Sequence, residues 1–482
     1  MTELSKLPDQ RRDSGLDPDD WEAFRATAHA LLDACVDRLR SARDLPWIPV
    51  PPDQAAAYRL DGVGRGEAAM ADRLAAEIMP YATGNTHPGF FGWVHGTGLA
   101  SGVLSEMVAA TMNANCGGRD HGMIHVERAV IGWTRGVMGF PETASGVLVT
   151  GTSQATVIAL AAARSRALGL RVREDGLGAA QLVAYAGLSA HAAVVKAMEL
   201  LGIGNRALRL VPMAGGGLDI GALQGMIAAD RAAGLQPFAL IGTAGSVDLG
   251  HFDDLNALAD LAGAEQLWLH VDGAFGAWTR LADAPWRALS DGIGRADSLA
   301  CDFHKWMYVP YDCGIVLIRS EADHRAAFAA RPAYLESQEA GLGGGEPWFC
   351  DYGTDLSRSG RALKVWAAIE AYGADRLGAA ITLNCRLAQE MADLVQANPR
   401  MRLMAPVTSN ICVFSADADL PNQQQSTLNR WIAQDLQLAG IAVFSTTKVD
   451  GITVLRAAIT NHRTRSIDVA RAVAAVAERR DR

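Results

Sequence analysis

The chain has 482 residues, of which 49% are hydrophobic and 20% are charged, and its formal net charge is −9. The composition is typical of a globular protein, and the length predicts two or three domains that share a large core. A mildly acidic chain has no general electrostatic attraction to nucleic acid or to an anionic membrane. We therefore expect neither of these as a binding partner.

The cysteines and the first residues of the chain indicate the cellular compartment of the protein. The chain begins with the polar stretch MTELSKLPDQRRDSG, which is unlike a signal peptide. It contains no run of about 18 apolar residues, so we expect no transmembrane helix. The seven cysteines are scattered and include no CxxC pair, which argues against a disulfide framework or a metal site and favours the reducing cytoplasm. These cysteines are Cys35, Cys116, Cys301, Cys313, Cys350, Cys385 and Cys412.

Residues 1–85 are predicted to form a helical N-terminal arm. Residues 20–41 and 66–80 carry apolar side chains at helical spacing, and WIPVPP at 47–52 interrupts the pattern between them. Because two short helices bury little surface alone, we expect this arm to pack on the rest of the chain or on another subunit.

Residues 86–360 are predicted to form a large α/β domain around a mostly parallel sheet. From about residue 146, short apolar runs alternate with segments of helical periodicity, as expected for a parallel sheet covered on both faces. Residues 321–350 interrupt the alternation and end in GLGGGEP, so they form either a mobile functional loop or a variable surface insertion. The predicted strands are GVLVT (146–150), LVAYAG (182–187), LRLVP (208–212), FALIGT (238–243), LWLHVD (267–272), SLACD (298–302) and GIVLIR (314–319).

Residues 361–482 are predicted to form a separate, smaller C-terminal α/β domain. Helical periodicity and apolar runs alternate here as well. The expected helices cover 359–373, 375–396 and 466–480, and the expected strands lie near 410–415, 441–445 and 452–459.

Two elements at predicted strand ends suit a phosphate and a flat ring. TGTSQAT (150–156) follows a strand and precedes a helix, so its backbone N–H groups and the helix dipole favour a phosphate there, although small residues also serve simply to make such a turn. His191 begins a helix after the next strand, where it either caps the helix or lies flat on an aromatic ring.

Two charged residues at later strand ends complete the pattern. Asp272 ends LWLHVD, and a buried acid requires a partner, for which a protonated pyridine nitrogen is suitable. Lys305 follows SLACD, and lysine is seldom buried unless it forms a Schiff base. Pyridoxal phosphate (PLP) needs a lysine, a carboxylate for its ring nitrogen, a phosphate site and a stacking group. The four elements together therefore predict PLP as the cofactor.

On these motifs the chain resembles the group II PLP-dependent decarboxylases, whose best-known member is aromatic-L-amino-acid decarboxylase. These enzymes belong to the fold-type I, aminotransferase-like superfamily. The resemblance implies a fold-type I PLP-dependent transferase-like α/β structure and a homodimer whose active sites form between two subunits. It covers nearly the whole chain and includes HPGFFGWV (87–94), GTAGSVDLGHFDD (242–254), HVDGAFGA (270–277), DFHKW (302–306), LSRSGRALKVW (356–366) and LRAAITNHRT (455–464).

The resemblance also implies roles for single residues. Lys305 would hold the cofactor, Asp272 would bind its ring nitrogen, and His191 would stack on its ring. Tyr334, in the segment 321–350, would protonate the substrate carbon after carbon dioxide leaves, which makes this segment a catalytic loop. The residues expected at the cofactor phosphate are Thr152, Ser153, Asp302 and His304, and Thr243 is expected to line the cofactor.

The substrate pocket departs from the pattern of the aromatic-acid enzymes. Where those enzymes carry an aromatic residue, a proline and a hydroxyl after the paired phenylalanines, this chain has Trp93, Val94, His95 and Gly96. Basic side chains here make the pocket more polar, or else they pair with Asp120 and Glu127 at a subunit surface. The candidate pocket residues are Phe90, Phe91, Trp93, His95, Arg119 and His121, with His125 nearby.

The sequence thus predicts a lyase that decarboxylates an L-amino acid, with aromatic acids favoured, to the amine and carbon dioxide. Three alternatives remain within the enzyme class: an oxygen-dependent aldehyde synthase on the same fold, a decarboxylase of an acidic or diamino acid, and a carbon–carbon lyase of the sphingosine-phosphate type. Outside that class, a catalytically silent PLP-binding subunit is the alternative, because fold alone does not fix function.

Overall fold

The computed structural model describes residues 15–330 and 338–482. The chain forms two compact units, Met1–His87 and Pro88–Arg482. The predicted boundaries at residues 85 and 360 stay predictions. No helix within the described ranges has both the length and the apolar character needed to cross a bilayer.

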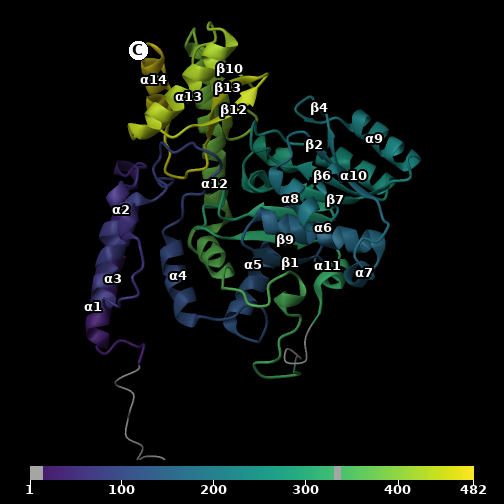
Figure 1. Cartoon of the computed structure of the whole chain (residues 1–482), viewed down its shortest axis with the longest axis horizontal. Coiled ribbons are helices and arrows are strands. Elements are labelled where there is room, and N and C mark those ends of the chain that lie inside the picture. The colour runs from purple at the N-terminus through teal and green to yellow at the C-terminus, as the bar shows by residue number, and fades with distance from the viewer. Residues whose placement is uncertain (1–14, 331–337) are drawn as a thin grey trace, which may run out of the picture. The chain divides into compact units, whose positions relative to one another are not determined.

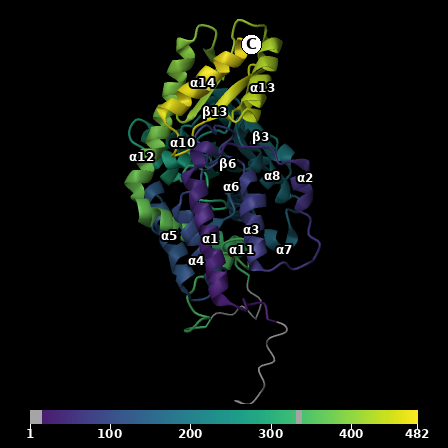
Figure 2. The same ribbon diagram turned by 90° about the vertical axis from the view of Figure 1, so that its left-hand side faces the viewer.

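The first unit is helical (Figures 1 and 2). Its longest helix is α1 (Trp21–Arg40), which begins where the Asp20 carboxylate accepts hydrogen bonds from two N–H groups of its first turn. None of the twenty residues of α1 is buried, and Trp21 is 59% exposed. The other helices of this unit are the 3₁₀ helix η2 (Ala42–Asp44), α2 (Pro52–Ala57), α3 (Glu67–Arg73), the π-helix η3 (Leu74–Ile78) and the 3₁₀ helix η4 (Met79–Tyr81).

A seven-stranded sheet lies at the centre of the second unit, in the order β1-β9-β8-β7-β6-β2-β3. Only β9 runs antiparallel to its two neighbours, so the other six strands share one direction. Most of these strands are buried along their whole length, which explains their uninterrupted apolar sequences. The strands are β1 (Ser145–Val149), β2 (Leu182–Gly187), β3 (Leu208–Val211), β6 (Gln236–Thr243), β7 (Trp268–Asp272), β8 (Ser298–Asp302) and β9 (Gly314–Ile318).

Helices cover both faces of this sheet (Figure 1), and the predicted α/β fold class is confirmed. A two-stranded hairpin, β4 (Met213–Ala214) with β5 (Gly217–Leu218), lies beyond β3. The α-helices of this part are α4 (Ser101–Met112), α5 (Gly122–Met138), α6 (Thr152–Leu168), α7 (Val172–Asp175), α8 (Ala192–Leu200), α9 (Ile220–Ala232), α10 (Leu255–Ala264) and α11 (Glu321–Phe328). Short 3₁₀ helices are η5 (Asn205–Ala207), η6 (Gly276–Leu281), η7 (Trp286–Ser290), η8 (Ile293–Arg295) and η10 (Phe349–Asp351).

A second, fully antiparallel sheet follows in the order β10-β11-β13-β12. The long helix α12 (Ala362–Ala397) leads into it and breaks at Gly373, whose φ of 70° lies in the left-handed region. This break separates the two helices that the sequence predicts on either side of residue 374. The remaining elements are β10 (Arg402–Leu403), β11 (Ile411–Ser415), α13 (Asn422–Leu438), β12 (Ser445–Val449), β13 (Ile452–Ala458) and α14 (Ser466–Arg480).

Candidate active site

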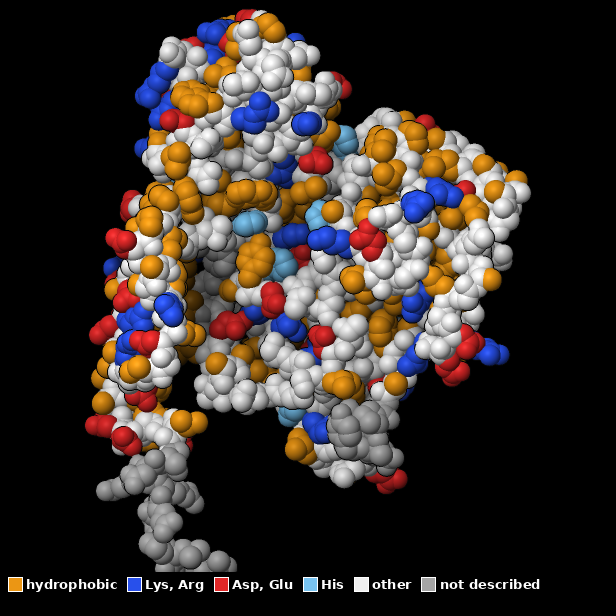
Figure 3. Space-filling view, viewed as in Figure 1, with side chains coloured by type: hydrophobic (Ala, Val, Ile, Leu, Met, Phe, Trp, Pro, Cys, Tyr) orange, Lys and Arg blue, Asp and Glu red, His pale blue; other side chains and the backbone are white. Residues whose placement is uncertain are grey.

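A cavity of about 470 Å³ lies at the carboxyl ends of the parallel strands. Because β1, β2, β6, β7 and β8 share one direction, the residues that end or follow them meet at one edge of the sheet. Figure 3 shows histidine side chains gathered with acidic and basic ones on this part of the surface. The lining residues are Trp93, Val94, His95, Thr150, Gly151, Thr152, Ser153, Ser189, His191, Thr243, Gly245, Ser246, Val247, Asp272, Ala274, Phe275, Asp302, His304, Lys305 and Tyr311.

Lys305 lines this cavity and is paired with Asp302. Its Nζ is 2.9 Å from Asp302 Oδ2, and its side chain is 21% exposed. The Asp302 carboxylate also accepts hydrogen bonds from the backbone N–H of Thr152, at 2.7 Å, and from the Thr152 hydroxyl. Asp302 therefore connects the lysine to the first turn of α6, and both donors of Thr152 are engaged by this carboxylate.

Asp272, at the end of β7, is a nearly isolated buried carboxyl group. It is 5% exposed and accepts a hydrogen bond from the Ala274 N–H at 3.2 Å. Burial raises the pKa of Asp272, and the positive charges of Lys305 and His191 oppose this effect. A cationic group in the cavity would therefore favour the ionised carboxylate.

His191 and the turn at the start of α6 lie where the sequence predicts them. His191 is the N-cap of α8, and its Nδ1 accepts a hydrogen bond from the Ala193 N–H at 3.2 Å. Its ring borders the same cavity as Asp272. Gly151 caps α6, and Ser153 is exposed in the first turn of that helix, at the positive end of its dipole.

Thr243 lines the cavity from the end of β6 and is fixed through its backbone. Its N–H donates to Asp253 Oδ2 at 2.7 Å, and the same carboxylate accepts from the Leu218 N–H at 2.8 Å. Burial raises the pKa of Asp253. Asp253, from the GHFDD motif, is therefore a positioning residue for this wall of the cavity.

His95 belongs to an aromatic wall. Its ring lies 5.6 Å from that of Phe90 and 5.7 Å from that of Trp93, and both pairs are stacked. Burial, together with the nearby Lys305 charge, lowers the pKa of His95. At position 96 a Cβ would lie 1.8 Å from the His304 carbonyl oxygen, so only glycine permits this close approach.

Tyr311 and His304 form a second aromatic pair. Their ring centroids are 4.3 Å apart, and His304 Nδ1 accepts a hydrogen bond from the Cys313 N–H. Burial raises the pKa of Tyr311 to about 12, so its hydroxyl stays protonated at neutral pH. The His95 and Tyr311 rings meet edge to face, with centroids 6.0 Å apart and 71° between their planes, so the aromatic wall is bent.

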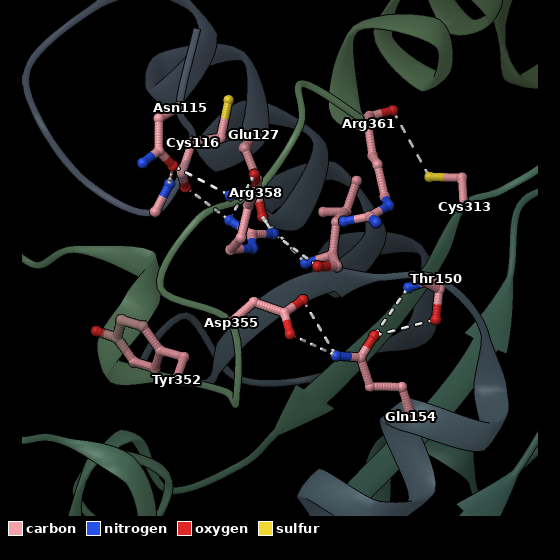
Figure 4. Close-up of polar contacts among 12 residues, drawn as sticks. Asn115, Cys116, Glu127, Thr150, Gln154, Cys313, Tyr352, Asp355, Arg358 and Arg361 are labelled. Carbon is pink, nitrogen blue, oxygen red and sulfur yellow. Dashed lines mark hydrogen bonds and ion pairs between the residues drawn. The ribbon is translucent and has the colours of Figure 1, made fainter. Parts of the chain in front are cut away.

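A buried ion pair supports the end of β1 (Figure 4). The Arg358 guanidinium donates to both carboxylate oxygens of Glu127, at 2.6 and 3.1 Å, and to the carbonyl oxygens of Cys116 and Leu148. Glu127 in turn accepts from the Leu148 N–H at 3.0 Å. Both side chains are almost completely buried, and each charge is compensated by the other and by these hydrogen bonds.

Gln154 fixes the turn between β1 and α6 from the other side (Figure 4). Its side-chain carbonyl accepts from the N–H and the hydroxyl of Thr150, both at 3.1 Å. Its amide nitrogen donates to Thr354 and to Asp355. The segment that follows residue 338 is thereby connected to the turn that ends β1.

Two predicted pocket residues, Phe90 and Phe91, do not line the cavity. The Phe91 N–H donates to the Val443 carbonyl at 2.8 Å, and this pairing directs the Phe91 ring into the core of the second sheet beside Phe444. Phe90 is 5% exposed and lies behind His95. The paired phenylalanines therefore support the wall that Trp93 and His95 present.

Three of the predicted basic residues, Arg119, His121 and His125, also lie away from the cavity formed by the described residues. The Arg119 guanidinium lies 4.6 Å from the ring centroid of Trp348. His121 Nε2 is 3.2 Å from a backbone carbonyl, and His125 pairs with Asp120 at 2.9 Å. The His125–Asp120 pair matches the alternative that the sequence leaves open, whereas Glu127 pairs with Arg358 instead. Tyr334 lies outside the described residues.

Sequence interpretation missed several lining residues, among them Ser189, Ser246 and Tyr311. Ser189 follows β2 and Ser246 follows β6, so a search for hydroxyl groups just after apolar strands would have identified both. Tyr311 follows Lys305 in MYVPYDCG, and no spacing rule indicates that its ring turns back onto His304.

These residues fit PLP. A buried carboxyl group with a raised pKa suits a protonated ring nitrogen, and a partly exposed lysine faces the same cavity. At Gly151 a Cβ would lie 3.3 Å from His304 Cε1 and 3.5 Å from Asp302 Oδ1, so its absence leaves room beside the α6 turn. The space and the donors at this turn suit a phosphate group.

Comparisons with known proteins agree with this assignment. The model of the pyridoxal-dependent decarboxylase conserved domain matches residues 66–417. The aromatic-L-amino-acid decarboxylase of Bacillus atrophaeus is 32% identical over 386 residues, which cover 78% of this chain and 78% of that protein. The phenylacetaldehyde synthase of Arabidopsis thaliana is 26% identical over 470 residues, which cover 92% of this chain and 93% of that protein.

A solved structure supports the fold. The crystal structure of Oryza sativa TDC with PLP and tryptamine matches with a TM-score of 0.87 at 24% identity, over 96% of this chain and 99% of that chain. The predicted cofactor and reaction type are confirmed, and the chain is a PLP-dependent amino-acid decarboxylase. It belongs to the pyridoxal-dependent decarboxylase family.

Proposed function

We propose that the chain decarboxylates an aromatic L-amino acid to the corresponding amine. The observation that carries this proposal is the wall of Trp93, His95 and Tyr311 in the cavity that holds Lys305. Aromatic rings that line a pocket favour aromatic side chains. The name of the Bacillus atrophaeus relative, an aromatic-L-amino-acid decarboxylase, supports the same substrate class.

We assign the cofactor to three strand-end residues. Lys305 would hold it covalently, Asp272 would keep its ring nitrogen protonated, and His191 would stack on its ring. Ser153 and His304 would lie at its phosphate, while Asp302 would hold Thr152 and Thr243 would line the ring. Bound there, PLP supplies an electron sink for the bond that breaks when carbon dioxide leaves.

Positioning and proton transfer are assigned to two different residues. Lys305 Nζ is 2.9 Å from a carboxylate oxygen of Asp302, which gives the amine a fixed position at the cavity. Tyr334 would donate the proton that replaces carbon dioxide on the substrate carbon, a role that rests on the position of this tyrosine in the sequence.

The test is a screen of amino acids for carbon dioxide release by the purified holoenzyme. We expect tryptophan, tyrosine, phenylalanine or a hydroxylated derivative to react fastest. A screen in which only aspartate, glutamate or diamino acids react would contradict the proposal.

An oxygen-dependent aldehyde synthase is a second candidate, because the Arabidopsis thaliana relative is a phenylacetaldehyde synthase. The chain retains both His191 and Tyr334, which favours the amine product. An oxygen electrode separates the two reactions, since an aldehyde synthase consumes oxygen in step with carbon dioxide release and a decarboxylase does not.

We further propose that the protein is a homodimer. One exposed stripe on α4 comprises Leu104, Met107, Val108 and Met112, each at least 48% exposed, at the spacing of one helical face. Independently, α1 buries none of its residues in this chain. Apolar surfaces of this kind are typical of the contact between two copies.

Sedimentation at working concentration tests this proposal. Leu104→Glu is expected to weaken the dimer, whereas Leu200→Glu, at an exposed leucine on α8, is not. A wild-type monomer that is fully active would contradict it.

The seven free cysteines support a reducing compartment, and we propose the cytoplasm.

A further inference from the structure

The segment that begins at Lys305 forms a tight turn with buried side chains. The Tyr308 N–H donates to the Lys305 carbonyl at 3.2 Å, which closes the turn over residues 305–308. The side chains of Trp306 and Tyr308 are completely buried. The Trp306 ring lies 5.9 Å from that of Phe275, which lines the active-site cavity. The position of the Lys305 backbone therefore depends on how these two buried side chains are held.

One side-chain amide, that of Asn384 on α12, binds both of them. Its Oδ1 accepts hydrogen bonds from Trp306 Nε1, at 3.0 Å, and from the Tyr308 hydroxyl, at 2.8 Å, so both lone pairs of this oxygen are engaged. Its Nδ2 donates to the Asn461 carbonyl at 3.0 Å. Asn384 is completely buried and does not line the active-site cavity formed by the described residues. It therefore acts on Lys305 only through the side chains that follow the lysine.

Tyr308 has an unusual backbone conformation. Its φ of 58° lies in the left-handed region, which a residue with a bulky side chain rarely adopts. Such a conformation is costly and persists only where the surrounding contacts hold it. The Leu99 N–H donates to the Tyr308 carbonyl at 2.8 Å, and the His462 ring packs edge-on against the Tyr308 ring at 5.3 Å. The hydroxyl bond to Asn384 adds to these contacts and helps to keep the turn in this shape.

A buried amide within a helix has a cost that an apolar residue would avoid. Asparagine is a weak helix former, and its buried polar atoms need partners. Ile381 and Cys385, its neighbours on α12, are completely buried, so a leucine at position 384 would suit this environment. A role confined to joining α12 to the segment after β13 needs only the bond to the Asn461 carbonyl. That role leaves the two bonds beside Lys305 unexplained.

We propose that Asn384 is a positioning residue for Lys305, which acts through Trp306 and Tyr308 to fix the turn from which the lysine reaches PLP. The Asp302 carboxylate, 2.9 Å from Lys305 Nζ, fixes the other end of the lysine side chain. The lysine is thus held at its backbone and at its amine, which sets the orientation of the cofactor ring. The proposal rests on the assignment of Lys305 to PLP and is independent of which amino acid is decarboxylated.

The experiment compares the PLP-loaded protein with its variants in two measurements. The first is the near-visible circular dichroism per bound PLP, which depends on the orientation of the ring in the site, and the second is the rate of PLP release after dilution. Asn384→Leu removes three hydrogen bonds, and Tyr308→Phe removes one and keeps the ring. The matched control is Asn429→Leu on α13. Its completely buried amide bonds to Ala416 and Thr453, which do not line the active-site cavity.

We expect Asn384→Leu to lose at least half of the dichroism per bound PLP and to release PLP roughly tenfold faster or more, with severalfold faster release in Tyr308→Phe. Asn429→Leu should lower the thermal midpoint as Asn384→Leu does, yet keep both cofactor measurements at the wild-type values. The proposal is overturned if Asn384→Leu and Tyr308→Phe match the wild type, or if Asn429→Leu changes both measurements as much as Asn384→Leu does. Should Asn384→Leu fail to fold, Tyr308→Phe alone decides.

Lys305→Ala separates this proposal from the assignment on which it rests. Covalent PLP retained in Lys305→Ala would overturn the assignment of the lysine, and the role of Asn384 with it. Loss of covalent PLP there, combined with unchanged Asn384→Leu and Tyr308→Phe variants, would overturn the role of Asn384 alone.

Discussion

Replacing Asp272 by asparagine tests the electrostatic basis of the proposed site. An opposite charge at close range raises the pKa of a cationic group by about 1–3 units. The Asp272 carboxyl is only 5% exposed, so solvent screens it little and the upper end of that range applies. Three units correspond to about 4 kcal/mol and to a ~1000-fold smaller ratio of protonated to neutral cofactor ring nitrogen. We expect the rate of carbon dioxide release to fall by a similar factor.

The fold should tolerate this change. Asparagine keeps an acceptor for the Ala274 N–H, and burial disfavours the charge that the change removes. The assay is carbon dioxide release at saturating substrate and PLP, with the thermal midpoint as the check on folding. Asp260→Asn, at an exposed carboxylate on α10, is the matched control. A cofactor-loaded Asp272→Asn variant with a rate within tenfold of the wild type would refute the reasoning.

Three further outcomes are expected. Lys305→Ala should abolish turnover and covalent retention of the cofactor, and measurable carbon dioxide release near the wild-type rate would remove Lys305 from the mechanism. Tyr334→Phe should slow amine formation and raise aldehyde, ammonia and peroxide, measured by product analysis with an oxygen electrode; an unchanged amine rate would exclude this tyrosine as the proton donor. Burial lowers the pKa of His324 from 6.5 to about 3. As the pH falls below about 6.5, the unfolded chain therefore binds this proton and the folded chain does not. The free energy of unfolding then decreases by about 1.4 kcal/mol per pH unit. His324→Gln should make the acid side of a pH–stability curve shallower by one proton, and an identical slope would contradict the assignment.

The sequence predicts the sheet and its active edge because both depend on local patterns. Uninterrupted apolar runs become the buried strands β1, β2, β7, β8 and β9. Parallel strands then bring their carboxyl ends to one edge, so Asp272 and Lys305 meet although 33 positions (305 − 272) separate them in the chain. Neither the apolar runs nor the shared direction of the strands requires knowledge of how distant segments pack.

The substrate pocket was harder to predict because it depends on packing between distant segments. Phe91 looks like a pocket residue in HPGFFGWV, but a backbone hydrogen bond to Val443 directs it into the second sheet. His95, four positions later, does reach the cavity.

The central claim is that Lys305 binds PLP in the cavity at the strand ends. Borohydride reduction of the PLP-loaded protein, followed by digestion and mass spectrometry, tests this claim most directly. The account predicts one pyridoxyl phosphate group per chain, on the peptide that contains Lys305. Modification centred on another lysine, such as Lys364, or no retained cofactor after reduction, would contradict it.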